Sequence, residues 1–113
     1  MAEPLSRAAT ATLNALLTGT DPVSSALRAQ IPYARVTDRC GCGCVTVDLE
    51  VDRSAVPPTT GASCPAADAW YEEPVDAGVM LFVQDGYLSL LEIYSASSAP
   101  ITTWPEPRFV DRP

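Results

Sequence analysis

The residues best suited to chemistry are four cysteines, three of which fall in one short segment rich in glycine. The segment 40–44 alternates cysteine with glycine, and the four cysteines of the chain are Cys40, Cys42, Cys44 and Cys64. Four thiolates suit tetrahedral zinc, and glycines let a short loop bring several sulfurs together. Zinc ribbons, however, use Cys-x-x-Cys spacing, and strand residues two apart lie about 7 Å from each other. Three interpretations therefore stay open: a zinc site, a disulfide or redox switch, and reduced thiols packed as small apolar side chains.

Three carboxylates recur at every second residue in the next segment. Residues 44–52 alternate apolar and polar side chains, which predicts a half-buried antiparallel strand with Asp48, Glu50 and Asp52 on one face. Such carboxylates can perform acid–base or magnesium chemistry, although on a solvated strand face they do neither. A protein with a basic surface is a further ligand for them. We expect these three residues to be partner-binding residues.

Two further candidates lie later in the chain. Trp70 and Tyr71 fall in the Pro-rich segment 53–77, which predicts a long loop, and they are partner-binding candidates because exposed Trp and Tyr often anchor partners. The same residues would also pin a loop to the core. Glu92 lies in an apolar strand, where a carboxylate must be paired or reach an edge. We expect an Arg or a backbone N–H to pair it, with a catalytic acid as the alternative.

The composition limits the kinds of function that the chain can have. Its 113 residues include seven basic and 14 acidic side chains, which give a formal net charge of −7. All the basic residues are arginine, so imidazole and amine catalysis are absent. The acidic balance argues against nucleic acid and against an anionic membrane surface. We therefore predict a non-enzymatic protein with no catalytic residues, and no cofactor apart from zinc at the cysteines.

The hydrophobic pattern predicts an α+β fold in one domain, 1–113. Residues 5–17 read as an amphipathic helix, and Asp21-Pro22 begins a second helix that Pro32 stops. Short strands are expected at 33–38 and 44–52, and a hairpin at 79–84 and 87–94. The two N-terminal helices should pack on an antiparallel sheet of about four strands. The tail from Ala99 should be extended and pack Trp104 against the sheet.

The hairpin is apolar on both faces. Asp85-Gly86 favours a two-residue turn, and a regular register follows from it. One face then carries Val79, Leu81, Val83, Leu88 and Leu90, together with Glu92. The other face carries Met80, Phe82, Ser89, Leu91 and Ile93.

Two short helices can cover only one face of that hairpin. The loop 53–77, the Pro-rich tail or another chain must cover the other, because monomers rarely expose a large apolar patch. A homodimer is the commonest solution, and a heteromeric protein complex is the alternative.

Several strings together resemble a family of small uncharacterised, mainly actinobacterial proteins of unknown function. They are Leu27-Arg28-Ala29-Gln30, Cys42-Gly43-Cys44-Val45-Thr46-Val47-Asp48-Leu49, and the hairpin strand Gly86 to Tyr94. The absence of lysine agrees with a GC-rich bacterial source. The resemblance covers roughly residues 13 to 105 and implies no catalytic residues.

These observations favour an acidic interaction module over the other classes of function. Its partner would be another protein, and small acidic proteins of this kind sometimes serve as immunity partners of toxins. The alternative is a zinc-binding or thiol-switch protein that uses Cys40, Cys42, Cys44 and Cys64. Since the start of the chain lacks a basic region followed by an apolar one, we expect the protein to be cytoplasmic.

Overall fold

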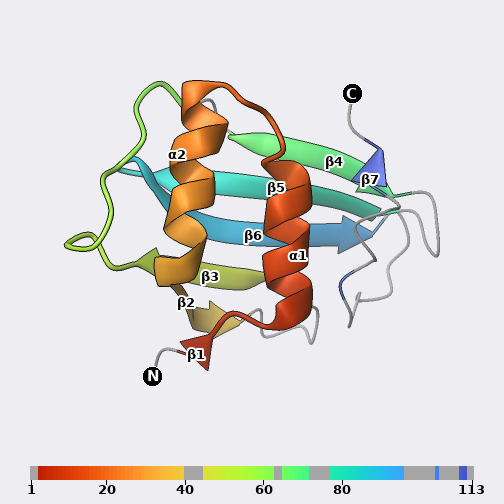
Figure 1. The fold of residues 1–113 in the computed structure, drawn as a ribbon. Helices are drawn as coiled ribbons and strands as arrows, with labels where there is room; N and C mark the ends of the chain where they lie inside the picture. The colour runs from red at the N-terminus through yellow and green to blue at the C-terminus, as the bar shows by residue number, and fades with distance from the viewer. Residues whose placement is uncertain are drawn as a thin grey trace.

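The computed structural model describes residues 3–39, 45–62, 65–71, 77–95, 104 and 110–111. Two α-helices lie across one face of a seven-stranded antiparallel sheet with strand order β1-β2-β3-β6-β5-β4-β7 (Figure 1). The helices are α1 (Arg7–Leu16), α2 (Pro22–Gln30) and the short 3-10 helix η1 (Ile31–Tyr33). The strands are β1 (Glu3–Pro4), β2 (Ala34–Arg39), β3 (Val47–Val51), β4 (Ala67–Tyr71), β5 (Ala77–Gln84), β6 (Tyr87–Ser95) and β7 (Val110–Asp111).

Both predicted helices form, and side-chain caps set where they begin. The hydroxyl of Ser6 accepts a hydrogen bond from the N–H of Ala9, and the carboxylate of Asp21 accepts one from the N–H of Ser24. Each cap satisfies an N–H that has no partner within its helix. The first helix is shorter than the predicted 5–17, because its cap places the start after Ser6.

The sheet is wider than the four strands that the sequence predicts. β4 lies inside the segment 53–77, which we expected to be a loop, and β1 and β7 contain two residues each. The alanines of β4 carry little apolar signal and favour strands weakly. This strand forms because it pairs with β5 along its whole length, from Ala67↔Leu81 to Tyr71↔Ala77. Two-residue strands are too short to show any periodicity.

The predicted hairpin forms, but its register shifts by one residue. Asp85 and Gly86 both have positive φ, 55° and 85°, as a two-residue primed turn requires. Gln84 pairs with Tyr87 and Val83 with Leu88, yet Phe82 pairs with Leu90. A bulge therefore adds one residue to β6 near its start.

This bulge changes which residues of β6 face the helices. Beyond it, Leu91 pairs with Leu81 and Ile93 with Val79, and all four of these side chains are buried. The prediction that Leu91 and Ile93 share a face with Met80 and Phe82 is therefore wrong. A one-residue slip moves every following side chain to the other side of a strand.

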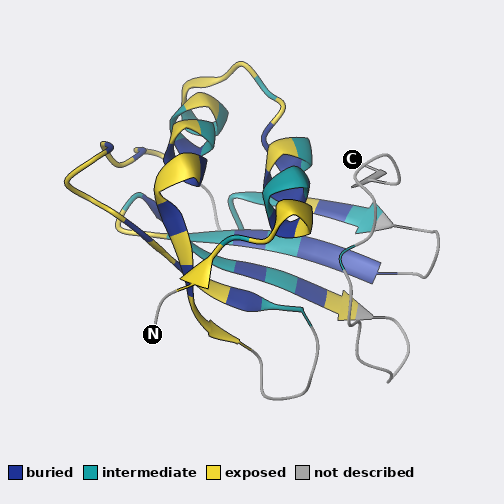
Figure 2. Ribbon diagram, turned by 60° about the horizontal axis from the view of Figure 1, so that its bottom comes forward, coloured by how far each residue is buried: buried dark blue, intermediate teal, exposed yellow. Residues whose placement is uncertain are grey.

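The core lies between the helices and the sheet. Buried positions alternate with exposed or half-buried ones along β3 and along the later part of β6, as Figure 2 shows. The largest fully buried apolar side chains come from both layers: Leu13, Leu16, Leu17, Leu27, Leu81, Leu88, Leu91 and Val79. Trp104, as predicted, packs half-buried against this core.

Candidate functional site

The face of the sheet opposite the helices, which we call the open face, carries a regular grid of side chains. No helix among the described residues lies on it (Figure 1). Strand register arranges its residues in three rows that cross the strands. The aromatic row is Trp70, Gly78 and Tyr94; the acidic row is Asp68, Met80 and Glu92; the apolar row is Phe82, Leu90 and Asp48.

The aromatic row holds a packed pair of rings. The ring centroids of Trp70 and Tyr94 lie 6.2 Å apart at an interplanar angle of 60°, which is an edge-to-face contact. Gly78 separates them on β5, and a Cβ there would overlap the Tyr94 ring. The tyrosine therefore leans across the glycine toward the tryptophan. It remains 45% exposed, so much of the ring is open to solvent.

The acidic row places an apolar side chain between two carboxylates. Asp68 is exposed, whereas Met80 and Glu92 are half-buried. Neither carboxylate has a hydrogen-bond or ion-pair partner within the described part of the chain. The Arg or backbone N–H that we expected beside Glu92 is thus not found among those residues. The bulge in β6 explains the difference, since it directs Glu92 to the open face.

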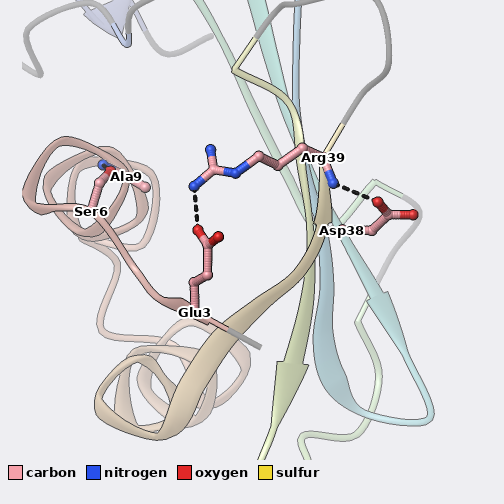
Figure 3. Close-up of polar contacts among 5 residues, drawn as sticks. All are labelled: Glu3, Ser6, Ala9, Asp38 and Arg39. Atoms are coloured by element: carbon pink, nitrogen blue, oxygen red, sulfur yellow. Dashed lines mark hydrogen bonds and ion pairs between the residues drawn. The ribbon is translucent and has the colours of Figure 1, made fainter. Parts of the chain in front are cut away.

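Further carboxylates extend the grid toward the edge at β2. Asp48 pairs directly with Asp38, and Glu50 pairs with Arg35. The side chains of Asp38 and Arg39 point to opposite sides of β2, and the Asp38 carboxylate accepts a hydrogen bond of 2.8 Å from the backbone N–H of Arg39 (Figure 3). Like charges directly opposite in a sheet destabilise it.

The open face consequently carries five carboxylates and one guanidinium among the strand residues whose side chains the structure describes. The carboxylates are Asp38, Asp48, Glu50, Asp68 and Glu92, and the guanidinium is that of Arg35. This imbalance gives the face a negative potential.

The residues proposed from the sequence fall in different places. Asp48, Glu50 and Trp70 lie on the open face, and Trp70 belongs to a strand and not to the predicted loop. Asp52 follows the end of β3, where its carboxylate accepts hydrogen bonds of 3.1 Å and 2.6 Å from the N–H and hydroxyl of Ser54. These bonds lower the pKa of Asp52 and stabilise a turn. The side chain of Tyr71 lies outside the described part of the structure.

The cysteine hypothesis concerns residues outside the described ranges. All four proposed ligands, Cys40, Cys42, Cys44 and Cys64, fall there. Among the residues that are described, no group of three or more His, Cys, Asp or Glu side chains could hold a metal ion. The carboxylates of the open face are thus spread across the sheet and do not converge on one point.

The string Leu27-Arg28-Ala29-Gln30 has a structural role. Leu27 is fully buried, and Arg28 donates hydrogen bonds to the carbonyl oxygens of Leu17 and Gly19, which end the preceding helix segment. Gln30 is also fully buried and bonds the backbone of the hairpin. These contacts join the two helices to each other and to the sheet.

The other two strings also contribute to the fold. The hydroxyl of Thr46 accepts a hydrogen bond of 3.0 Å from the N–H of Ile93 and donates one of 3.2 Å to its carbonyl oxygen, which extends the pairing of β3 with β6. The carbonyl oxygen of Gly86 accepts a 2.8 Å hydrogen bond from the N–H of Thr59. No catalytic arrangement emerges from these described residues.

Two pockets lined by described residues lie on the helix side of the molecule. One of about 410 Å³ lies between the helices and the N-terminal edge, and its one charged side chain is that of Arg28. That guanidinium is already bonded to the carbonyl oxygens of Leu17 and Gly19. A second pocket of about 310 Å³ lies beside α1 and is bordered by Trp104. Neither brings a nucleophile and a base together.

Sequence reasoning missed Tyr94, Asp68 and Asp38, whereas Met80 was expected on the hairpin face that another chain could cover. A signal for two of them was present, because an acid precedes an aromatic residue by two positions both at 68–70 and at 92–94.

Within the described ranges, neither α-helix has the length and apolar character needed to cross a membrane. Compared with known proteins, the chain matches no family model, no curated protein and no solved structure.

Proposed function

We propose that this chain is a non-enzymatic interaction module that binds a basic protein surface through the open face. The observation that carries the proposal is the charge distribution on that face, where the described side chains include five carboxylates against the guanidinium of Arg35. Complementary charge steers partners toward a surface and selects among them. A partner with clustered arginine or lysine residues would neutralise these carboxylates, including the opposed pair Asp38 and Asp48.

The apolar side chains on the open face support the same function. Met80, Phe82 and Leu90 are half-buried and form a continuous centre. Phe82 pairs with Leu90 across β5 and β6, and Met80 lies two residues from Phe82 on the same face of β5. Carboxylates from both sides surround them. An apolar centre within a polar rim is the usual composition of a protein–protein interface.

A partner with basic character fits this face better than a second copy of the chain does. A two-fold symmetric contact places the same patch on both sides of the interface. Two open faces would therefore bring carboxylates against carboxylates, and like charges facing each other across an interface cost several kcal/mol. The net charge of −7 adds to that repulsion. We infer a heteromeric complex.

The test is a titration of the isotope-labelled chain with hexa-arginine amide, followed by the backbone amide resonances. We expect the shifts to fall on β3, β4, β5 and β6, and to shrink as salt screens the charges. Hexa-glutamate is the matched control and should shift nothing. Residues of α1 such as Thr10 and Asn14 should not respond. Shifts confined to the helices, or no shifts at all, would overturn the proposal.

A further inference from the structure

The aromatic row and the acidic row lie side by side on three neighbouring strands. β4 and β6 both pair antiparallel with β5, so they run in the same direction on either side of it. On each of them an acid is followed two residues later by an aromatic residue on the same face: Asp68 and Trp70, Glu92 and Tyr94. The central strand contributes Met80 and Gly78.

We propose that these two rows form a binding site for an arginine side chain of the partner, an inference that rests on the proposed function. Asp68 and Glu92 lie two strand spacings apart, which is about 10 Å between their Cα atoms. A guanidinium between them over Met80 reaches both carboxylates with its forked N–H groups. The aliphatic part of the arginine then lies along the Trp70–Tyr94 pair, where a planar cation also stacks on a ring face.

The burial of Glu92 makes a cation at this place favourable. Its carboxylate is half-buried on a central strand, and no described residue donates a hydrogen bond to it. Removing a carboxylate from water costs free energy unless a donor replaces the water. An arriving guanidinium supplies those donors. A purely structural role, in which Tyr94 covers Gly78 and packs on Trp70, accounts for the aromatic contact. It does not account for the two carboxylates of Asp68 and Glu92 in the next row.

The site should prefer arginine to lysine. The guanidinium is planar and presents five donors in a fixed fork, whereas the ammonium of lysine is a compact and strongly hydrated point charge. Two separated carboxylates beside the half-buried Trp70 ring and the exposed Tyr94 ring match the planar, forked geometry of the guanidinium. We expect hexa-arginine amide to bind at least about threefold more tightly than hexa-lysine amide.

The two tryptophans provide an internal control for the experiment. Trp70 belongs to the site, whereas Trp104 lies beside α1 near Ser6 and Ala8, on the helix side of the sheet. During titration with hexa-arginine amide, the indole N–H resonance of Trp70 should move and that of Trp104 should not. Equal movement of both would contradict a local site.

Two pairs of variants distinguish a specific arginine site from general attraction between the acidic face and a basic peptide. Tyr94→Leu should weaken hexa-arginine binding about fivefold and abolish the preference over hexa-lysine, while Tyr94→Phe should bind almost as the unmodified chain does. Glu92→Gln should weaken binding more than Glu50→Gln, which removes the same charge elsewhere on the open face. Amide spectra of all variants first establish that each is folded.

The outcomes distinguish this inference from the proposed function. If the peptides shift the open face but arginine and lysine bind equally and Trp70 does not respond, the arginine site is wrong and the interaction surface stands. If Glu92→Gln and Glu50→Gln weaken binding equally, the site is also wrong. If no residue of the open face responds to either peptide, the proposed function itself fails.

Discussion

The side chain of Gln30 at the end of α2 is hydrogen-bonded to the backbone N–H of Leu88, just past the hairpin turn. Its Oε1 accepts from that N–H at 2.9 Å, and its Nε2 donates to the carbonyl oxygen of Gly86, also at 2.9 Å. The amide is fully buried. This contact positions β5 and β6 against the helices, and these two strands form the centre of the open face.

Replacing Gln30 should destabilise the protein. In Gln30→Met the N–H of Leu88 loses its partner in a buried environment, whereas the carbonyl of Gly86 keeps the N–H of Thr59. An unsatisfied buried donor costs about 1–3 kcal/mol, and we expect a loss near 2 kcal/mol in the free energy of unfolding measured with urea. Gln84→Met, at an exposed position of β5, is the matched control and should change stability by less than about 0.5 kcal/mol. Similar losses in both variants would contradict a specific role for Gln30.

The hairpin turn should tolerate an added methyl group less well than a second glycine of similar backbone conformation. Gly86 and Gly61 both have positive φ, 85° and 79°. A Cβ at Gly86 would meet the Thr59 carbonyl oxygen at 2.5 Å, while a Cβ at Gly61 would meet nothing within 4 Å.

The difference in the free energy of unfolding between the two alanine variants measures the steric cost of a Cβ at Gly86. Gly61→Ala carries only the cost of a left-handed residue, about 1–2 kcal/mol. Gly86→Ala should cost at least about 1 kcal/mol more, because the chain at Thr59 must also move. Urea unfolding of both measures the difference, and equal costs would show that the turn can relax without strain.

Local signals in the sequence predicted the parts of the fold that short-range chemistry determines. Ser6 and Asp21 begin helices because their side chains accept backbone N–H groups, and Asp85-Gly86 forms the turn because both positions need positive φ. The bulge near Ser89 has no such signal, since it depends on how β6 fits against β3, β5 and the helices together.

Because the sequence carries no local signal for the bulge near Ser89, the residues of the candidate site could be predicted only in part. With the bulge, Glu92 and Leu90 face away from the helices and join Met80 and Phe82. A regular hairpin would have placed Leu91 there instead. β4 was missed for a related reason, because its alanines become recognisable as a strand only through their pairing with β5. The grid of the open face is therefore a property of the tertiary pairing and not of any single segment.

Acid should weaken the attachment of β1 at the edge of the sheet. The guanidinium of Arg39 donates a 2.6 Å hydrogen bond to Oε2 of Glu3 and holds the pKa of that carboxyl below its usual value of 4.5 (Figure 3). The contribution to stability is complete above the pKa of the unfolded chain and is lost as pH falls through the lower pKa of the folded one. The free energy of unfolding should therefore decrease below about pH 4.5.

A double-variant comparison assigns that pH dependence to the pair. Glu3→Gln removes the titrating group and Arg39→Gln removes the cause of its lowered pKa, so each should flatten the dependence by the same amount. The double variant should flatten it no further. The effect will be small because both side chains are more than half exposed, at 59% and 55%, and solvent screens the pair. Additive changes would contradict the assignment.

Peptide binding should not depend on the cysteines. None of the aromatic, acidic and apolar rows contains Cys40, Cys42, Cys44 or Cys64. Adding a chelator or a thiol reductant should therefore leave the shifts caused by hexa-arginine amide unchanged. Elemental analysis of the pure chain measures bound zinc separately. Stoichiometric zinc together with loss of peptide binding on chelation would instead favour the zinc-binding alternative.

The chain should be monomeric in the absence of a basic partner. The corrected register leaves Met80, Phe82 and Leu90 on the open face and buries Leu91 and Ile93 against the helices, so the apolar patch is smaller than the sequence suggested. Carboxylates surround it, and they repel the same face of a second copy. Light scattering at micromolar concentration should give a mass near 12.0 kDa.

The double variant Asp48→Arg, Asp68→Arg should self-associate more readily, because each copy then offers cations to the carboxylates of the other. A dimer of the unmodified chain that persists in low salt and is broken by Phe82→Glu would show that the open face binds its own copy and not a basic partner.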